Sequence, residues 1–98
     1  MFQVIAVYPP KKAGKVVCRA QVVLTQPSYM KAEDYNKETD KSYMQAEGMC
    51  SAGFKFSVSI ITDSAGQPMC VGTILPPFDI GRSIANEALK LLGQRDAA

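Results

Sequence analysis

Two stretches of alternating side chains constrain the fold of this chain most. In residues 16–25 and again in residues 54–62, apolar side chains recur at every second position, with mostly polar side chains between them. A period of two is typical of a β-strand that buries one face and exposes the other. The pattern therefore predicts two strands of a sheet that has one apolar face to cover.

Each alternating stretch has an expected partner strand. Residues 2–8 form an almost continuous apolar run, and the proline pair 9–10 ends it because proline has no N–H to donate to a ladder. Residues 69–75 follow the segment 63–66, which has aspartate first and glycine fourth, as type I turns favour. Two β-hairpins are expected, one in each half of the chain.

A helix is expected over residues 80–92, with Asp79 or Ser83 as its N-cap and Gly93 as the glycine that follows it. The expected fold is α+β: a four-stranded, mainly antiparallel sheet in the order β-β-(α)-β-β-α, with the C-terminal helix packed on one face. The expected core consists of Val4, Ala6, Cys18, Val22, Leu24, Phe56, Val58, Ile60, Val71, Ile84, Ala88 and Leu91.

The chain has 98 residues, which fits one domain over residues 1–98. Residues 28–53 are a polar connection between the hairpins, rich in helix formers but without a sustained apolar stripe. We expect one or two short, largely exposed helices there, with Ser28 as N-cap and an end at Gly48.

Residue usage argues against common catalytic and metal chemistry. The chain has no histidine, which removes the most common general base and histidine-containing zinc sites. Cys18, Cys50 and Cys70 are too widely spaced for a zinc pair and are a poor disulfide framework. We therefore expect a non-enzymatic protein with no cofactor and no metal. Reduced thiols and the lack of a signal-peptide pattern favour the cytoplasm, and no apolar run is long enough for a membrane span.

Charge is distributed unevenly along the chain. Residues 1–28 carry Lys11, Lys12, Lys15 and Arg19 and no acidic residue, although the whole chain has a net charge of only +2. Lysines on a hairpin tip can contact phosphates without reading sequence. One expected function is therefore a nucleic-acid-binding accessory protein that uses the basic hairpin tip 11–19. The simpler alternative is that these lysines are solvated and protect the sheet from aggregation.

A short repeat lies in the acidic middle of the chain. The sequence SYMKAE at residues 28–33 recurs as SYMQAE at residues 42–47. On one continuous helix both Tyr-Met pairs would lie on nearly the same face. Tyrosine and methionine make adaptable protein contacts, and the candidate protein-binding residues are Tyr29, Met30, Tyr35, Tyr43 and Met44. Docking of this segment on the chain's own sheet is the alternative.

The leading functional hypothesis is a small protein-binding module. It would be an inhibitor or adaptor, of the kind encoded by phages or plasmids, that occupies the surface of a partner protein. The acidic segment favours a partner with a basic surface, and the protein itself could be a monomer or a homodimer. The second hairpin with residues 83–93 resembles the ββα end of double-stranded-RNA-binding domains over less than half of the chain. The basic cluster of those domains is reduced here to Arg82, and no family is assigned.

Overall fold

The computed structural model describes the backbone of residues 1–32 and 49–97, and side chains for residues 1–31 and 49–94. The elements, in chain order, are β1 (Phe2–Tyr8), β2 (Val16–Leu24), β3 (Lys31–Ala32), β4 (Lys55–Thr62), β5 (Pro68–Val71), β6 (Ile74–Leu75) and α1 (Phe78–Ala97).

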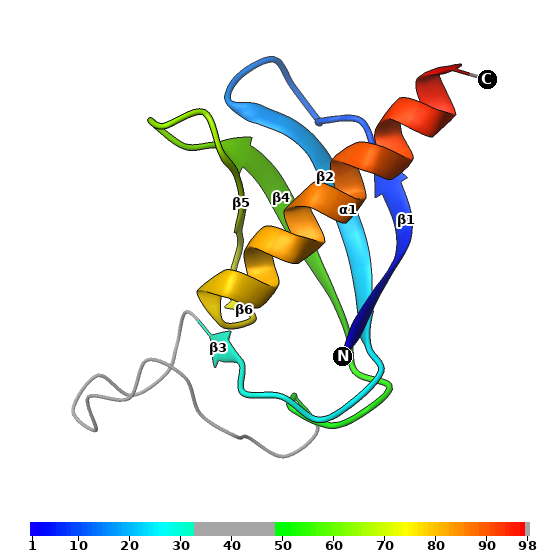
Figure 1. Cartoon of the computed structure of the whole chain (residues 1–98), viewed down its shortest axis with the longest axis vertical. Helices are drawn as coiled ribbons and strands as arrows, with labels where there is room; N and C mark the ends of the chain where they lie inside the picture. Colours follow the sequence, from blue (N-terminus) through cyan, green and yellow to red (C-terminus); the bar gives the residue numbers. More distant parts are fainter. Residues whose placement is uncertain (33–48, 98) are drawn as a thin grey trace.

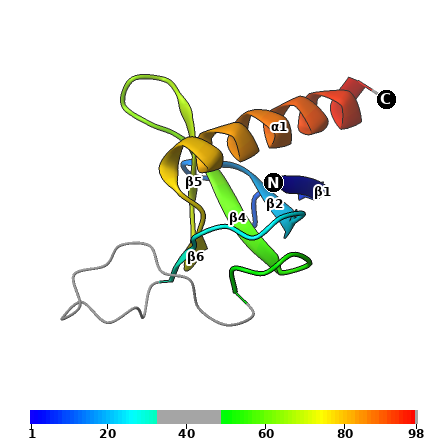
Figure 2. The same ribbon diagram turned by 60° about the horizontal axis from the view of Figure 1, so that its bottom comes forward.

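One four-stranded sheet with one helix on it makes up the body of the fold. The sheet has the order β1-β2-β4-β5, and each neighbouring pair is antiparallel. Helix α1 crosses one face diagonally and contacts β1, β2 and β5 (Figure 1). Figure 2 shows α1 as a separate layer on one side of the sheet. The expected α+β arrangement of two hairpins and a covering helix is thus confirmed.

The core lies between α1 and the sheet. Buried positions on β2 and β4 alternate with more exposed ones, as the period of two predicts. Nine expected core residues are buried: Val4, Cys18, Val22, Leu24, Phe56, Val58, Ile60, Ile84 and Ala88. The structure adds Ala20, Met30, Cys50, Cys70 and Ala85 to them.

Three expected core residues are only partly buried. Strand β1 has a bulge between Val4 and Ala6, which moves Ala6 to the face away from α1, where it pairs with Gln21. On β5, Cys70 points into the core, so Val71 falls on the opposite face. Leu91 is half-buried and lines a groove at the edge of the sheet.

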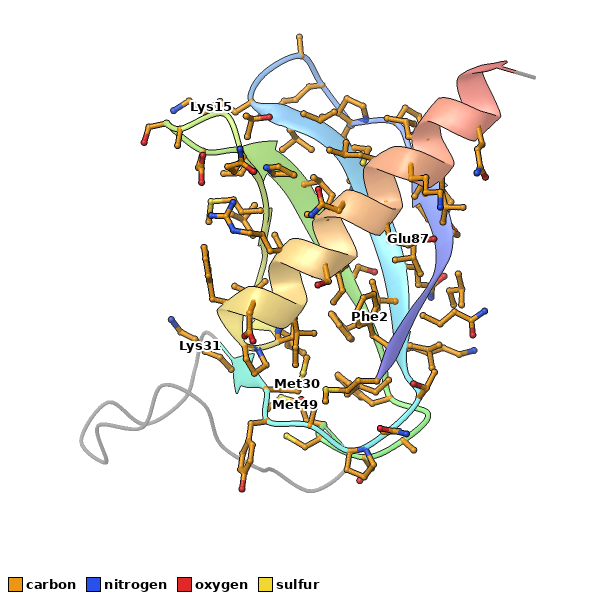
Figure 3. All side chains as sticks on the ribbon, in the orientation of Figure 1. Phe2, Lys15, Met30, Lys31, Met49 and Glu87 are labelled. Carbon is orange, nitrogen blue, oxygen red and sulfur yellow. The ribbon has the colours of Figure 1, made fainter. Side chains whose placement is uncertain are left out.

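The segment that follows β2 begins differently from the expected helix. The Ser28 N–H donates to the Cys50 carbonyl at 3.0 Å, and Lys31–Ala32 pairs with β6 as the short strand β3. Met30 is completely buried at the lower end of the sheet (Figure 3). Residues 28–32 therefore do not form an exposed helix. Burial of the apolar Met30 side chain in the core stabilises the extended arrangement instead. The rest of the expected helical connection, residues 33–48, lies outside the described residues.

The second hairpin and the helix differ from expectation in their limits. The turn 63–66 is confirmed, with Gly66 N–H donating to the Asp63 carbonyl at 3.0 Å. The returning strand breaks at Gly72 and Thr73, and its last part, β6, pairs with β3 instead of β4. Helix α1 begins two residues early, and it continues through Gly93 to Ala97 instead of ending there.

Candidate functional site: the open face of the sheet

The second face of the sheet is not covered by α1, the one helix among the described residues. Because alternate side chains on a strand point to opposite faces, residues beside the buried positions belong to this second face. Lys55 and Ser57 on it are exposed, and Arg19, Gln21 and Ser59 are partly exposed. We call this surface the open face, and its central side chains are Tyr8, Arg19, Gln21, Lys55, Ser57 and Ser59.

Strand register places the open-face residues in rows across the sheet. The first row runs over all four strands, from Tyr8 to Arg19, Ser59 and Val71. In the second row Gln21 lies between Ala6 and Ser57. Since neighbouring strands are about 4.8 Å apart, the first row extends over about 14 Å.

Arg19 is the best-anchored cation on the open face. Its Nε donates a hydrogen bond to the Pro9 carbonyl at 3.1 Å, which ties β2 to the start of the hairpin loop. Its guanidinium also lies over the Tyr8 ring, with Cζ 5.5 Å from the ring centroid. A cation at this distance is attracted by the electrons of the ring face. The pair therefore presents an aromatic ring and a planar cation side by side.

A hollow of about 370 Å³ opens beside this pair. Its walls include Tyr8, Arg19 and Lys11 on one side and the hydroxyl residues Ser57, Ser59 and Thr73 on the other. Hydroxyls both donate and accept hydrogen bonds, whereas lysine and arginine only donate. The hollow can therefore bind a ligand that combines negative charge with planar, hydrogen-bonding groups.

The charge of the open face has one sign. Arg19 and Lys55 occupy strand positions on it and Lys11 borders its hollow, while the rows contain no carboxylate. Of the acidic side chains that the structure describes, Asp63 is paired with Arg82 and the other two are on α1. The positive potential of this face is thus not neutralised by a described neighbour.

The structure brings together only part of the predicted basic hairpin tip. Lys11 and Arg19 both line the hollow, whereas Lys12 and Lys15 are exposed in the hairpin loop and do not. The prediction missed Tyr8 and Lys55. The only signal for Tyr8 in the sequence is its place before the proline pair, which brings the end of β1 opposite Arg19 once the hairpin closes.

The predicted protein-binding residues differ in their exposure to solvent. Tyr29 is 56% exposed, as a contact residue should be, but Met30 is 0% exposed and belongs to the core. The expectation that Met30 is a surface contact is therefore wrong in this structure. Tyr35, Tyr43 and Met44 lie outside the described residues.

The cysteines lie in the core and away from the open face. Burial raises the pKa of the Cys70 thiol to about 12, and nearby Cys18 adds to the effect. The Cys70 Sγ donates to the Gly81 carbonyl at 3.1 Å, which joins β5 to α1. The described residues contain no group of three histidine, cysteine, aspartate or glutamate side chains that could hold a metal ion. Within the same residues, no helix is long and apolar enough to cross a membrane.

No protein-family model matches the chain, and neither the curated proteins nor the solved structures include a significant match to it.

Proposed function

We propose that this protein binds single-stranded nucleic acid on the open face of its sheet. The observation that carries the proposal is the Tyr8–Arg19 pair beside a hydroxyl-lined hollow, on a face without a described carboxylate. Proteins that bind single strands combine positive charge, which follows the phosphates, with aromatic rings on which bases stack.

Phosphate binding is assigned to the cations of the open face. A guanidinium has five N–H donors, and the hydrogen bond from Arg19 to Pro9 uses one of them. The remaining fork matches the geometry of a phosphate. Lys11 and Lys55 extend the positive surface along the hairpin loop and β4, so that a strand crossing the sheet meets a cation at each of three places.

Base binding is assigned to the Tyr8–Arg19 pair and the hollow. The Tyr8 ring is 41% exposed, and both an exposed aromatic ring and an arginine plane can stack on a base. Ser57 and Ser59 can then hydrogen-bond to the base edge or to a ribose hydroxyl.

Cys18 and Cys70 are free thiols, and free thiols agree with the proposed cytoplasmic location.

Fluorescence anisotropy with labelled oligonucleotides tests the proposal. We expect oligo(U) and oligo(dT) of about twelve nucleotides to bind at low salt, and more tightly than a duplex of the same length. Tyr8→Ala should weaken binding by about fivefold or more, because loss of one stacked base is worth at least about 1 kcal/mol. Arg19→Gln should lower the slope of log affinity against log salt by about 0.7.

Lys90→Gln is the matched control, because it removes the same charge from an exposed position on α1, on the other side of the sheet. It should leave affinity nearly unchanged. Equal losses in Lys90→Gln and Arg19→Gln would show that binding follows net charge alone and would exclude the open face as the site. Tighter binding of the duplex would instead favour phosphate contacts by the loop lysines Lys12 and Lys15.

A further inference from the structure

Strand β1 is an open edge of the sheet. It pairs with β2 on one side, and no described strand pairs with its other side. An edge strand can present backbone groups on which an added strand forms, and residues 2–4 are the part of β1 that lines a groove on this side. Strand β5 forms the opposite edge, but it is shorter and begins with a proline. Of the two edges, β1 is therefore the better template for an added strand.

A groove runs between this edge and α1. It encloses about 570 Å³ and is lined by Phe2, Gln3 and Val4 of β1 and by Ser83, Glu87 and Leu91 of α1. Figure 3 shows Phe2 on the edge strand and Glu87 on the side of α1 that faces this strand. Its lining includes half-buried or buried apolar side chains, notably Val4 at 9% exposure. The groove therefore combines apolar side chains of both elements with the polar side chains of Gln3, Ser83 and Glu87 along a strand edge.

Glu87 is the only charged side chain in the lining of this groove. It forms no ion pair with the side chains that the structure describes. A basic side chain in the groove would meet this carboxylate and add a favourable interaction. The charge therefore selects a cationic ligand here, opposite in sign to the ligand of the open face.

A second copy of the chain does not fit this groove well. Two copies paired through their β1 strands would each place residues 2–8 in the groove of the other, and these residues include no lysine or arginine. Neither Glu87 would gain a partner. A foreign segment with its own basic residue satisfies the groove better.

We propose that an extended peptide with a basic side chain docks beside residues 2–4 of β1 as a fifth strand, in the groove between β1 and α1. Backbone hydrogen bonds to β1 give such a complex its affinity, and alternate side chains give it specificity. Side chains on the α1 side of the peptide enter the groove, where a basic residue contacts Glu87. An aliphatic residue two positions away packs on Val4 and Leu91.

Selection from a displayed library of random linear peptides tests this proposal with the full chain as the target. We expect enriched sequences in which a lysine or arginine and an aliphatic residue are separated by one position. A selection that enriches no peptide, or only peptides without a basic residue, would overturn the proposal. Sedimentation that shows dimers whose formation requires β1 would overturn it as well.

Two variants and a chemical scan locate the bound peptide. Glu87→Gln should lower the affinity for the selected peptide by about two- to fivefold, as expected for a partly solvated ion pair. Asp79→Asn removes the same charge from the exposed first turn of α1 and should have no effect. N-methylation of each peptide amide in turn should reduce affinity at every second position, because alternate amides face β1.

Equal sensitivity of all amides, or of none, would show that the peptide does not bind as an added strand. Equal effects of Glu87→Gln and Asp79→Asn would show attraction by overall charge instead of a contact in the groove. The groove and the open face are separate surfaces, so neither result depends on nucleic-acid binding.

Discussion

Arg82 of α1 donates a hydrogen bond to the Asp63 carboxylate at 3.1 Å and so ties the helix to the turn between β4 and β5. The same carboxylate accepts the backbone N–H groups of Ala65 and Gln67 at 2.9 and 2.8 Å. Asp63 therefore organises the turn and fixes it to the helix. The guanidinium of Arg82 also lies over the Phe78 ring, with Cζ 4.8 Å from the ring centroid.

The acid stability of the fold should depend on Asp63. The hydrogen bond from Gln67 is the main cause that lowers the pKa of this carboxyl below its usual value, and Arg82 contributes to it. A lowered folded-state pKa stabilises the fold above the unfolded pKa, and this stability is lost as the pH falls through the folded value. We expect Asp63→Asn to lower the urea midpoint at pH 7. The difference between the urea midpoints at pH 7 and at about pH 3 should also be smaller than in the parent protein.

Arg82→Gln is the companion variant, because it removes the ion pair but leaves the backbone hydrogen bonds of the turn. It should reduce the pH dependence less than Asp63→Asn does. The assignment would be wrong if the Asn variant lost as much stability in acid as the parent.

Met30 should be a core residue in solution and not a contact residue. It is 0% exposed, so truncation to alanine should cost about 2–5 kcal/mol of unfolding free energy. Its neighbour Tyr29 is 56% exposed, and Tyr29→Ala should change stability by no more than about 0.5 kcal/mol. Chemical denaturation of both variants makes the comparison. Similar values for the two would contradict the docking of residues 28–32 on the sheet.

Two glycines should respond to alanine in opposite directions. Gly66 has a φ of 81° in the turn after β4, a conformation in which a Cβ is strained. Gly66→Ala should destabilise the fold by about 1–2 kcal/mol. Gly93 lies within α1, and apart from the local helix backbone no described atom lies within 4 Å of an added Cβ, so Gly93→Ala should stabilise the fold by about 0.5–1 kcal/mol. Thermal melts that show no gain for Gly93→Ala would contradict a helix that continues to Ala97.

The Cys70 thiol should make the fold sensitive to alkaline pH. Burial raises its pKa from 9.0 to about 12, so between these values the folded state keeps a proton that the unfolded state has lost. Stability should therefore fall as the pH rises above about 9. In urea denaturation, the unfolding free energy of Cys70→Ala should decline less steeply over this pH range than that of the parent protein, although the variant is less stable at pH 7. An equally steep decline would exclude Cys70 as its source.

The sequence predicts the elements of this fold better than its surfaces. The alternation in β2 and β4 identifies most of the core because one phase of each strand is apolar throughout, whereas the other phase carries polar or charged side chains in its middle. The bulge at Ile5 leaves no local signal, yet it moves Tyr8 from the core phase to the open face. Arg19 could be placed outward from its own strand, but its partner Tyr8 depends on this bulge. The period of β2 is similarly broken at Val17, between the pairs made by Val16 and Cys18.

The prediction of an exposed helix at residues 28–32 was wrong for a different reason. Their polar, helix-forming composition predicts local structure, whereas the burial of one methionine and the pairing of β3 with β6 depend on residues far away in the chain. Helix α1 likewise extends beyond Gly93, because a glycine near the end of a helix permits termination but does not require it.

Nucleic-acid binding by the open face can be observed residue by residue in an NMR titration of the ¹⁵N-labelled protein with oligo(U) at low salt. Changes in amide chemical shift should concentrate on the open face, at residues such as Arg19, Ser57 and Ser59. The amide signals of α1 residues that face the sheet, such as Ala85, should not shift. The shifts on the open face should reverse as salt is added. Shifts that concentrate on α1, or a spectrum that oligo(U) leaves unchanged at low salt, would contradict nucleic-acid binding by the open face.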